Sequence, residues 1–179
     1  VKTVAIVPGS FKPPHRGHLH LAEELAAVAD EVLVFVSNPS ESKRLLPYSN
    51  TEISYDKAID LWKVLVEYSN VSNIRIVESD NPSPSPVPIL GELLKSKDER
   101  EYYNDFDFYP EDYKAFYMGV SSKDEDDPRF EMYDGDQRIK KKVISAARHS
   151  DAYVKELGKF KSEIGEMAAA EIEADAVDF

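Results

Sequence analysis

Two histidines spaced three residues apart follow a glycine-containing turn near the start of the chain. The stretch reads Val7-Pro8-Gly9-Ser10-Phe11-Lys12-Pro13-Pro14-His15-Arg16-Gly17-His18. Gly9 lets the backbone approach a ligand closely, and a helix beginning after the prolines presents unpaired N–H groups to an anion. Both imidazoles project from one face of that turn, and Lys12 and Arg16 add positive charge. The stretch predicts a phosphate site. The alternative, that the histidines only cap or pack a helix, is disfavoured by the strand and glycine turn before them.

Strands and helices alternate along the rest of the chain. Apolar runs and helical periodicity predict strands over 3–8, 31–37, 74–77 and 114–120, and helices over 17–29, 52–69 and 89–95. Strands separated by helices of this length form βαβ units with a parallel sheet, and ligands bind at the carboxyl ends of the strands. The prediction is an α/β fold: a Rossmann-like three-layer sandwich with a mostly parallel sheet and a C-terminal helical extension.

Domain boundaries follow from this order. Residues 1–150 are predicted to form one domain, with an insertion or loop region at 81–113, and residues 151–179 a helical extension of it. Four prolines within 81–88 favour an extended surface loop, with a lid beside the site as the alternative. The segment 102–109 mixes aromatic and acidic residues. Its aromatics are expected to dock on the core, and a stacking platform for a base is the alternative.

The glycine turn with its histidines resembles the signature of the HxGH nucleotidyltransferase superfamily, which has a cytidylyltransferase-like fold. The form Gly-Ser-Phe-x-Pro-Pro-His-x-Gly-His is most similar to the nicotinate/nicotinamide mononucleotide adenylyltransferases, although Lys12 stands where the family often has Asp or Asn. The resemblance implies transfer of a nucleotidyl group, AMP from ATP, to a small phosphate-bearing acceptor such as nicotinamide or nicotinate mononucleotide. Pyrophosphate is the leaving group.

The resemblance also implies roles for particular residues. The catalytic groups are His15 and His18 at the α- and β-phosphates and Lys43 in the loop after the second strand, and Arg44 binds the acceptor. The nucleotide pocket is lined by Gly9, Ser10, Phe11, Lys12 and Gly17. Mg²⁺ is expected to arrive with the nucleotide, held by phosphates and water rather than by a protein cage.

Two later segments could complete the nucleotide site. After the fourth strand the family has Gly-x-Asp, but this chain has Gly119-Val120-Ser121, so Lys123, Asp124 and Arg129 are predicted substitutes unless they form a solvated acidic loop. The stretch Val143-Ile144-Ser145-Ala146-Ala147-Arg148 partly matches the family's Ile-Ser signature and predicts Ser145 and Arg148 as phosphate ligands. A plain helix over 138–149 is the alternative.

Composition limits the remaining functions. The 179 residues include no cysteine, which excludes disulfides, a thiolate zinc site and a cysteine nucleophile. A net charge of -12 argues against nucleic acid as a partner, and no membrane-spanning stretch is expected. A soluble cytoplasmic protein is the natural interpretation, and the resembled family is often a homo-oligomer.

Other functions stay open at this point. A cytidylyltransferase acting on a sugar or polyol phosphate would carry a similar motif. A non-catalytic nucleotide-binding module would keep the fold but grip the triphosphate poorly. A scaffold protein would use the acidic stretch 98–136 and the aromatic segment as docking surfaces.

Overall fold

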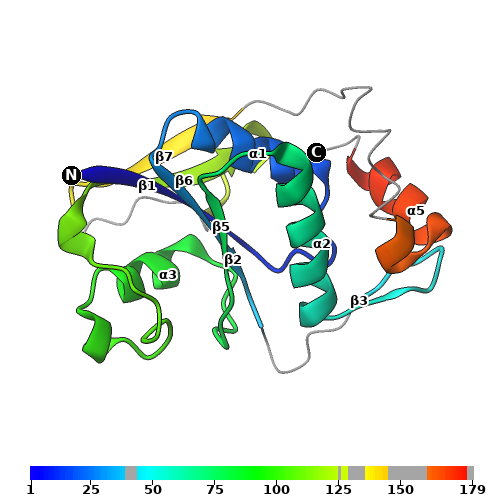
Figure 1. Cartoon of the computed structure of the whole chain (residues 1–179), viewed down its shortest axis with the longest axis horizontal. Coiled ribbons are helices and arrows are strands. Elements are labelled where there is room, and N and C mark those ends of the chain that lie inside the picture. Colours follow the sequence, from blue (N-terminus) through cyan, green and yellow to red (C-terminus); the bar gives the residue numbers. More distant parts are fainter. Residues whose placement is uncertain (39–43, 125, 129–135, 145–160, 177–179) are drawn as a thin grey trace.

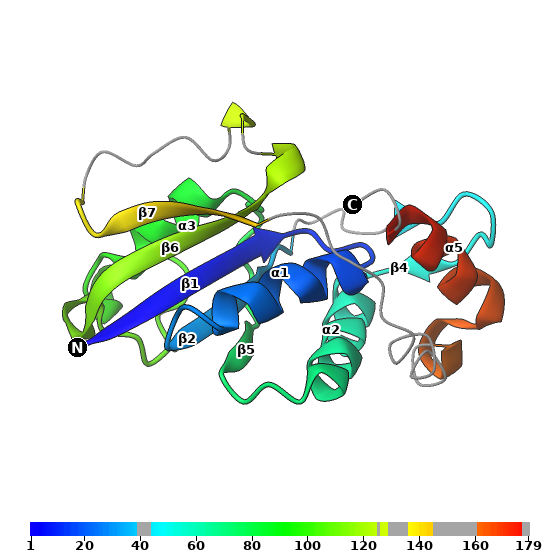
Figure 2. The same ribbon diagram turned by 90° about the horizontal axis from the view of Figure 1, so that it is seen from above.

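The chain folds around a sheet of five parallel strands (Figures 1 and 2). The computed structural model describes residues 1–38, 44–124, 126–128, 136–144 and 161–176. The strands are β1 (Lys2–Gly9), β2 (Glu31–Val36), β5 (Ile74–Val77), β6 (Tyr113–Ser121) and β7 (Ile139–Ile144), in the order β5-β2-β1-β6-β7. Every neighbouring pair in this sheet is parallel. The predicted Rossmann-like α/β fold is confirmed.

Helices cover both faces of the sheet. Helices α1 (Arg16–Ala26) and α2 (Tyr55–Ser69) pack on one face, and α3 (Pro86–Leu93) on the other (Figure 1). Successive side chains of β1 alternate between the faces: Ala5 and Val7 join the cluster under α1 and α2, whereas Val4 and Ile6 join the cluster under α3. Two hydrophobic cores result, one on each side of the sheet.

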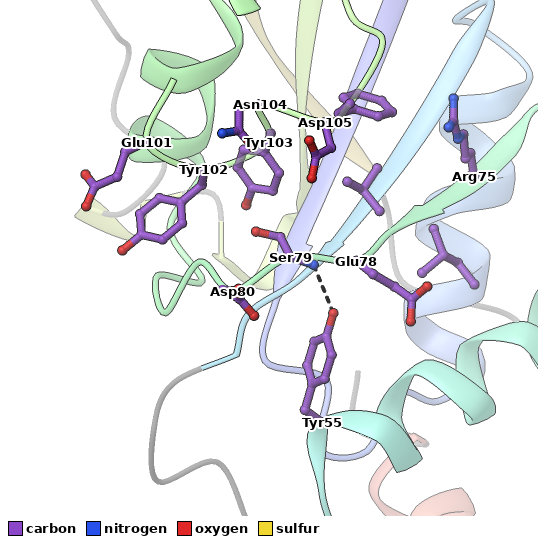
Figure 3. Close-up of a pocket in the computed structure, with 13 residues that line it drawn as sticks. Tyr55, Arg75, Glu78, Ser79, Asp80, Glu101, Tyr102, Tyr103, Asn104 and Asp105 are labelled. Atoms are coloured by element: carbon purple, nitrogen blue, oxygen red, sulfur yellow. Dashed lines mark hydrogen bonds between the residues drawn. The ribbon is translucent and has the colours of Figure 1, made fainter. Parts of the chain in front are cut away.

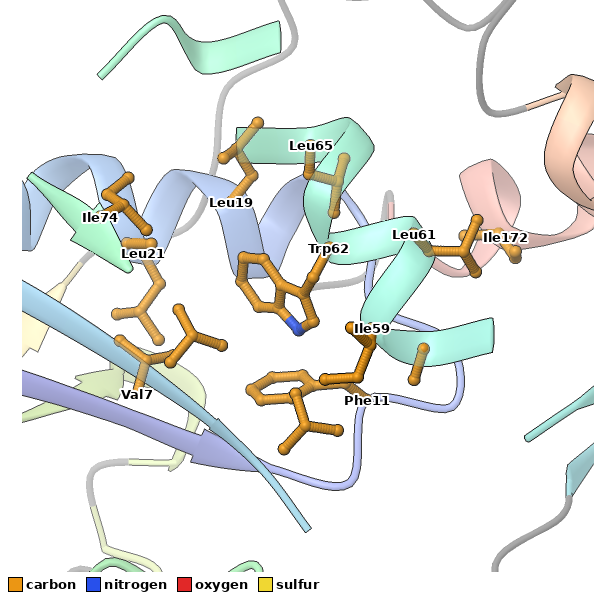
Figure 4. Close-up of a cluster of buried hydrophobic side chains, with 14 of the residues drawn as sticks. Val7, Phe11, Leu19, Leu21, Ile59, Leu61, Trp62, Leu65, Ile74 and Ile172 are labelled. Atoms are coloured by element: carbon orange, nitrogen blue, oxygen red, sulfur yellow. The ribbon is translucent and has the colours of Figure 1, made fainter. Parts of the chain in front are cut away.

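Short elements connect and extend these layers. The strands β3 (Arg44–Leu45) and β4 (Glu52–Ile53) form a small antiparallel hairpin before α2. The C-terminal helix α5 (Glu166–Ala176) packs beside α2 and this hairpin, with Ile172 in the same core as Leu61 (Figure 4). In the described part of the chain there are also the short 3₁₀ helices η1 (Lys97–Glu99), η2 (Pro110–Asp112) and η3 (Ser122–Asp124).

The strand order explains where a ligand can bind. From β1 the chain moves outward to β2 and β5, then returns to the other side of β1 for β6 and β7. Ligands of open α/β sheets bind at such a switch point, beside the carboxyl ends of the strands. The glycine turn follows β1, and η3 follows β6. The two segments therefore lie on the same edge of the sheet.

Two details differ from the sequence predictions. The third helix begins at Pro86 rather than at residue 89, because proline suits the first helical position, where no backbone donor is needed. Residues 139–144 form strand β7, so a plain helix over 138–149 is wrong for that part. In the C-terminal extension, Gly165, at a φ of 89°, separates a helical turn at 161–164 from α5. Residues 151–160 lie outside the described part.

The aromatic segment after α3 docks on the core, as expected. Tyr103 and Phe108 are buried in the cluster under α3. Phe108 stacks on Tyr113 with ring centroids 4.6 Å apart. Within the described ranges, no helix is long and apolar enough to span a bilayer.

Candidate nucleotide-binding site

The turn after β1 is built around the ring of Phe11. A Cβ atom added to Gly9 would lie 2.7 Å from Cζ of Phe11, so only glycine leaves room for the ring. Phe11 itself takes a left-handed φ of 49°. Its ring meets Trp62 of α2 edge to face at 5.0 Å and meets His18 at the same separation (Figure 4). The turn thus packs through the Phe11 ring against Trp62 of the hydrophobic core.

Both histidines of the motif cap the start of α1. His15 is the N-cap residue, and its Nδ1 accepts a hydrogen bond of 3.0 Å from the backbone N–H of Gly17. In return, Nδ1 of His18 accepts a hydrogen bond of 3.0 Å from the backbone N–H of His15. This is a capping box made from two imidazoles, in positions where Ser or Thr and Glu or Gln are usual.

The capping box fixes the tautomer that each ring adopts in its neutral form. An imidazole nitrogen that accepts a hydrogen bond carries no proton, so each neutral ring holds its proton on Nε2. Each histidine therefore has an Nε2–H donor at the end of the ring opposite the capped backbone. The rings stack with centroids 3.9 Å apart. The two donors come from adjacent, stacked rings whose planes are inclined by 25°, an arrangement that suits two oxygens of one polyphosphate.

His18 is held in its neutral form. Burial lowers the pKa of His18 well below its ordinary value, and the charge of a protonated His15 would lower it further. A neutral imidazole keeps the capping box intact and still donates through Nε2. The positive charge at this site must therefore come from other groups and from the N-terminus of α1, where the helix dipole is positive.

Three basic side chains lie near the turn in different environments. Lys12 is half-buried, and burial lowers its pKa. Arg16, expected to add charge for a phosphate, is buried and pairs with Glu173 of α5 at 3.1 Å. Arg44 is exposed, and its Nη1 donates to the carbonyl oxygen of Lys12 at 3.2 Å. Arg44 thus contacts the glycine turn, and its role in acceptor binding stays a prediction.

Other residues predicted from the sequence lie at the same edge of the sheet. Ser10 is exposed after β1, and its Oγ accepts a hydrogen bond of 3.3 Å from Oγ of Ser37. Lys123 and Asp124 form part of η3, directly after β6. Four predicted site residues fall outside the described residues: Lys43, Arg129, Ser145 and Arg148.

A cavity of about 590 Å³ opens at the carboxyl end of β5 (Figure 3). It lies between β5, the start of α2 and the segment 101–106. Its lining residues are Tyr55, Arg75, Ile76, Val77, Glu78, Ser79, Asp80, Glu101, Tyr102, Tyr103, Asn104, Asp105 and Phe106. Sequence reasoning suggested a stacking role for 102–109 but missed this cavity. Its walls are distant in sequence, and only the placement of β5 at the end of a βαβ unit could have indicated it.

The cavity and the glycine turn are connected through the ends of the strands. The backbone N–H of Ser37, after β2, donates to the carbonyl of Gly9 at 2.9 Å. The N–H of Asn38 then donates to the carbonyl of Asn81 at 2.8 Å. Asn81 directly follows the cavity residues Ser79 and Asp80. A ligand could therefore extend along this edge from the histidines to the cavity.

Buried polar groups fix the far wall of the cavity. The guanidinium of Arg100, which is only 4% exposed, donates to backbone carbonyls of residues 92–95, at the end of α3, and of residues 103–108. The acceptors are Glu92, Leu93, Lys95, Tyr103, Phe106 and Phe108. The hydroxyl of Tyr103 accepts from Nδ2 of Asn81 at 2.9 Å, and burial raises the pKa of Tyr103 to about 12. These hydrogen bonds hold the wall in place, and the tyrosine stays protonated at neutral pH.

Comparison with known proteins identifies the family. The model of the family described as Cytidylyltransferase-like matches residues 6–124, and the chain belongs to this family. The resemblance to HxGH nucleotidyltransferases is thereby confirmed. The matched range runs from β1 through the glycine turn to η3, so it contains the edge of the sheet described above.

Curated relatives are adenylyltransferases by name. The phosphopantetheine adenylyltransferase of Lactobacillus acidophilus is 32% identical over 106 residues, which are 59% of this chain and 59% of the relative. That of Natranaerobius thermophilus is 35% identical over 86 residues, or 43% of this chain and 52% of the relative. That of Leifsonia xyli is 39% identical over 57 residues, or 32% of this chain and 36% of the relative. The chain therefore matches only 36% to 59% of the length of these relatives.

Solved structures share the fold over nearly the whole chain. The nicotinic acid mononucleotide adenylyltransferase of Plasmodium falciparum complexed with APC superposes with a TM-score of 0.54 at 14% identity, over 98% of this chain and 96% of the other. The same enzyme complexed with NaAD gives 0.52 at 15% identity, over 86% and 80%. The likeness shows a common fold.

Proposed function

We propose that this protein is an adenylyltransferase that transfers AMP from ATP to a small acceptor bearing a phosphate group. A phosphate oxygen of the acceptor attacks the α-phosphorus of ATP and forms the new P–O bond. The bond between that phosphorus and the bridging oxygen to the β-phosphate breaks, and pyrophosphate leaves. No protein nucleophile takes part, so catalysis rests on positioning and on stabilising negative charge.

The observation that carries this proposal is the capping box of His15 and His18. It fixes both rings with their Nδ1 atoms turned to the backbone, which leaves Nε2–H as the donor of each neutral ring. Donors fixed before the reaction stabilise charge that develops on phosphate oxygens, at no cost in reorganisation. The positive end of α1 acts on the same oxygens.

The acceptor is proposed to lie along the sheet edge from Arg44 to the cavity at β5. Its phosphate would be held near the glycine turn, where Arg44 meets the carbonyl of Lys12. Its distal part would fill the cavity beside Tyr55 and Tyr103. The names of the relatives suggest two acceptors to test, phosphopantetheine and nicotinic acid mononucleotide.

Magnesium is proposed to enter with the nucleotide. Mg²⁺ prefers oxygen ligands and keeps several waters, whereas the turn offers the imidazole nitrogens of His15 and His18. Within the described ranges, no group of three or more His, Cys, Asp or Glu side chains could hold a metal ion. Lys123 and Asp124, and the predicted residues Lys43, Arg129, Ser145 and Arg148, remain proposed contacts of the triphosphate.

The test is release of pyrophosphate from each of ATP, CTP, GTP and UTP with Mg²⁺. The acceptors are phosphopantetheine, nicotinic acid mononucleotide, nicotinamide mononucleotide and a polyol phosphate. Turnover with ATP and one acceptor is the expected result. Turnover with CTP alone would replace the proposal by a cytidylyltransferase, and nucleotide binding without turnover would leave a binding module.

Matched variants assign the turnover to the histidines. Asparagine at position 18 keeps an acceptor for the N–H of His15 but has no donor at the place of Nε2, so His18→Asn separates capping from chemistry. The rate should fall by a factor of about 10² to 10³. His20 of the same helix takes no part in the box, so His20→Asn should keep the wild-type rate. Full activity of His18→Asn would remove this residue from the mechanism.

A further inference from the structure

Glu171 on α5 binds the turn of the β3–β4 hairpin. Its Oε1 accepts a hydrogen bond of 2.8 Å from the backbone N–H of Tyr48. Its Oε2 accepts from the N–H and the hydroxyl of Ser49, at 3.1 and 2.8 Å. Although burial alone would raise its pKa, these hydrogen bonds lower the pKa of Glu171 overall. The side chain is only 8% exposed and stays ionised.

A second carboxylate of α5 binds the histidine turn itself. Oε2 of Glu173 lies 3.1 Å from Nε of Arg16, whose side chain is 9% exposed. Arg16 stands between the N-cap histidine and Gly17, whose N–H closes the capping box. Residues two apart on a helix point in different directions. Glu171 and Glu173 can therefore bind two different elements.

The hairpin and the glycine turn also touch each other. Arg44, the first residue of β3, donates to the carbonyl of Lys12. Beneath these polar contacts, Leu46 and Ile53 of the hairpin share a hydrophobic core with Ile172 of α5. Three elements are thus joined pairwise: α5 to the hairpin, α5 to α1, and the hairpin to the turn before α1.

We propose that Glu171 is a positioning residue for the anion site, and that it acts through Arg44. By fixing Tyr48 and Ser49, its carboxylate holds the hairpin in the conformation that keeps the Arg44 guanidinium against the glycine turn. Glu171 itself touches no substrate. The inference rests on the proposed function, because it assigns Arg44 to the phosphates that this site would bind.

The test is binding of inorganic pyrophosphate, the proposed leaving group, measured by isothermal titration calorimetry. In Glu171→Gln the amide N–H₂ takes the place of one carboxylate oxygen and must face the backbone N–H of Tyr48 or of Ser49, so one hydrogen bond to the hairpin is lost. If that hydrogen bond stabilises the conformation that binds pyrophosphate and not the alternatives, its loss should weaken binding by about tenfold. Glu166→Gln makes the same charge change at an exposed position of α5 and should bind like the wild type.

A double-mutant cycle separates positioning from general stability. If Glu171 acts through Arg44, then Glu171→Gln should weaken pyrophosphate binding in the wild type but not in the Arg44→Ala background. Equal weakening in both backgrounds would overturn the inference, and so would wild-type affinity of Glu171→Gln. If Glu171→Gln does not fold, Ser49→Ala serves as the second variant, because it removes only the hydroxyl donor to Glu171. It should weaken pyrophosphate binding by about threefold. Wild-type affinity of Ser49→Ala would overturn the inference.

The binding assay also keeps this inference apart from the proposed function. A wild type that binds pyrophosphate and shows the predicted cycle but turns over no acceptor would contradict the enzyme and support the positioning role. If the wild type transfers AMP from ATP and Glu171→Gln binds pyrophosphate as tightly as the wild type, the enzyme is supported and the positioning role of Glu171 is contradicted. A wild type that does not bind pyrophosphate would overturn the inference.

Discussion

The ring of Trp62 lies 6.5 Å from the ring of His18, with the planes tilted by 44°. Trp62 is the single tryptophan of the chain and is fully buried. It therefore lies beneath the histidine turn, with Phe11 packed edge-on against both rings. This relationship makes the intrinsic fluorescence of the protein a probe of the candidate site.

Fluorescence should report the protonation of His18. A protonated imidazole quenches a nearby indole, so the emission of Trp62 should fall as His18 gains a proton. Because burial lowers the pKa of His18, the midpoint should lie below 6.5, the ordinary value for histidine. A pH titration of the native protein measures it. The transition should vanish in His18→Asn and persist in His20→Asn; a midpoint at or above 6.5 would contradict the structure.

The same shift predicts how stability depends on pH. A histidine whose pKa is lowered by folding binds its proton more readily in the unfolded chain, so acid favours unfolding. The wild type should lose stability as pH falls below 6.5, by up to about 1.4 kcal/mol per pH unit until the folded pKa is reached. Urea unfolding at pH 7.5, 6.5 and 5.5 measures the loss. His18→Asn should show a shallower loss over this window, and identical slopes for both proteins would refute the linkage.

The sequence was informative wherever a pattern is local. Strand β2 is an almost continuous apolar run and β5 is rich in Ile and Val, and the motif from Gly9 to His18 stands between a strand and a helix, so these elements could be predicted. The partners of these elements depend on the tertiary fold. Arg16 was expected to face a phosphate, but the distant Glu173 pairs with it. Nothing in the acidic run of α5 distinguishes Glu171 or Glu173 from exposed carboxylates.

The cavity at β5 shows the same limit. The cavity combines Tyr55 from the start of α2, Ser79 after β5 and Tyr103 from the segment before β6. The wall at Tyr103 is held by Arg100, whose buried guanidinium binds backbone carbonyls rather than a carboxylate. Every residue has a backbone carbonyl, so the sequence does not show which carbonyls an arginine will bind. A buried arginine of this kind therefore cannot be distinguished from a surface arginine by sequence alone.

Two glycines offer a matched test of the turn. In Gly9→Ala the new methyl group would lie 2.7 Å from Phe11 and would push its ring off Trp62, which should cost about 1–3 kcal/mol and weaken nucleotide binding. In Gly91→Ala the methyl group of an α3 residue meets nothing within 4 Å, so helix propensity should stabilise the protein by up to about 1 kcal/mol. Thermal unfolding with and without ATP compares them. Unchanged stability and ATP binding in Gly9→Ala would show that the ring is not held as described.

The charge of the cavity predicts which acceptors the enzyme prefers. Four carboxylates line it, those of Glu78, Asp80, Glu101 and Asp105, against the guanidinium of Arg75. Because these groups are exposed, water and salt screen their electric field. The remaining repulsion should still disfavour an acceptor whose distal end carries a negative charge. Nicotinamide and nicotinic acid mononucleotides form a matched pair that differs by a carboxamide in place of a carboxylate. At low salt kcat/KM should favour the amide by about threefold or more, and Asp105→Asn or added salt should reduce the preference. A preference for the acid that survives both changes would mean that the acceptor's distal end binds outside this cavity.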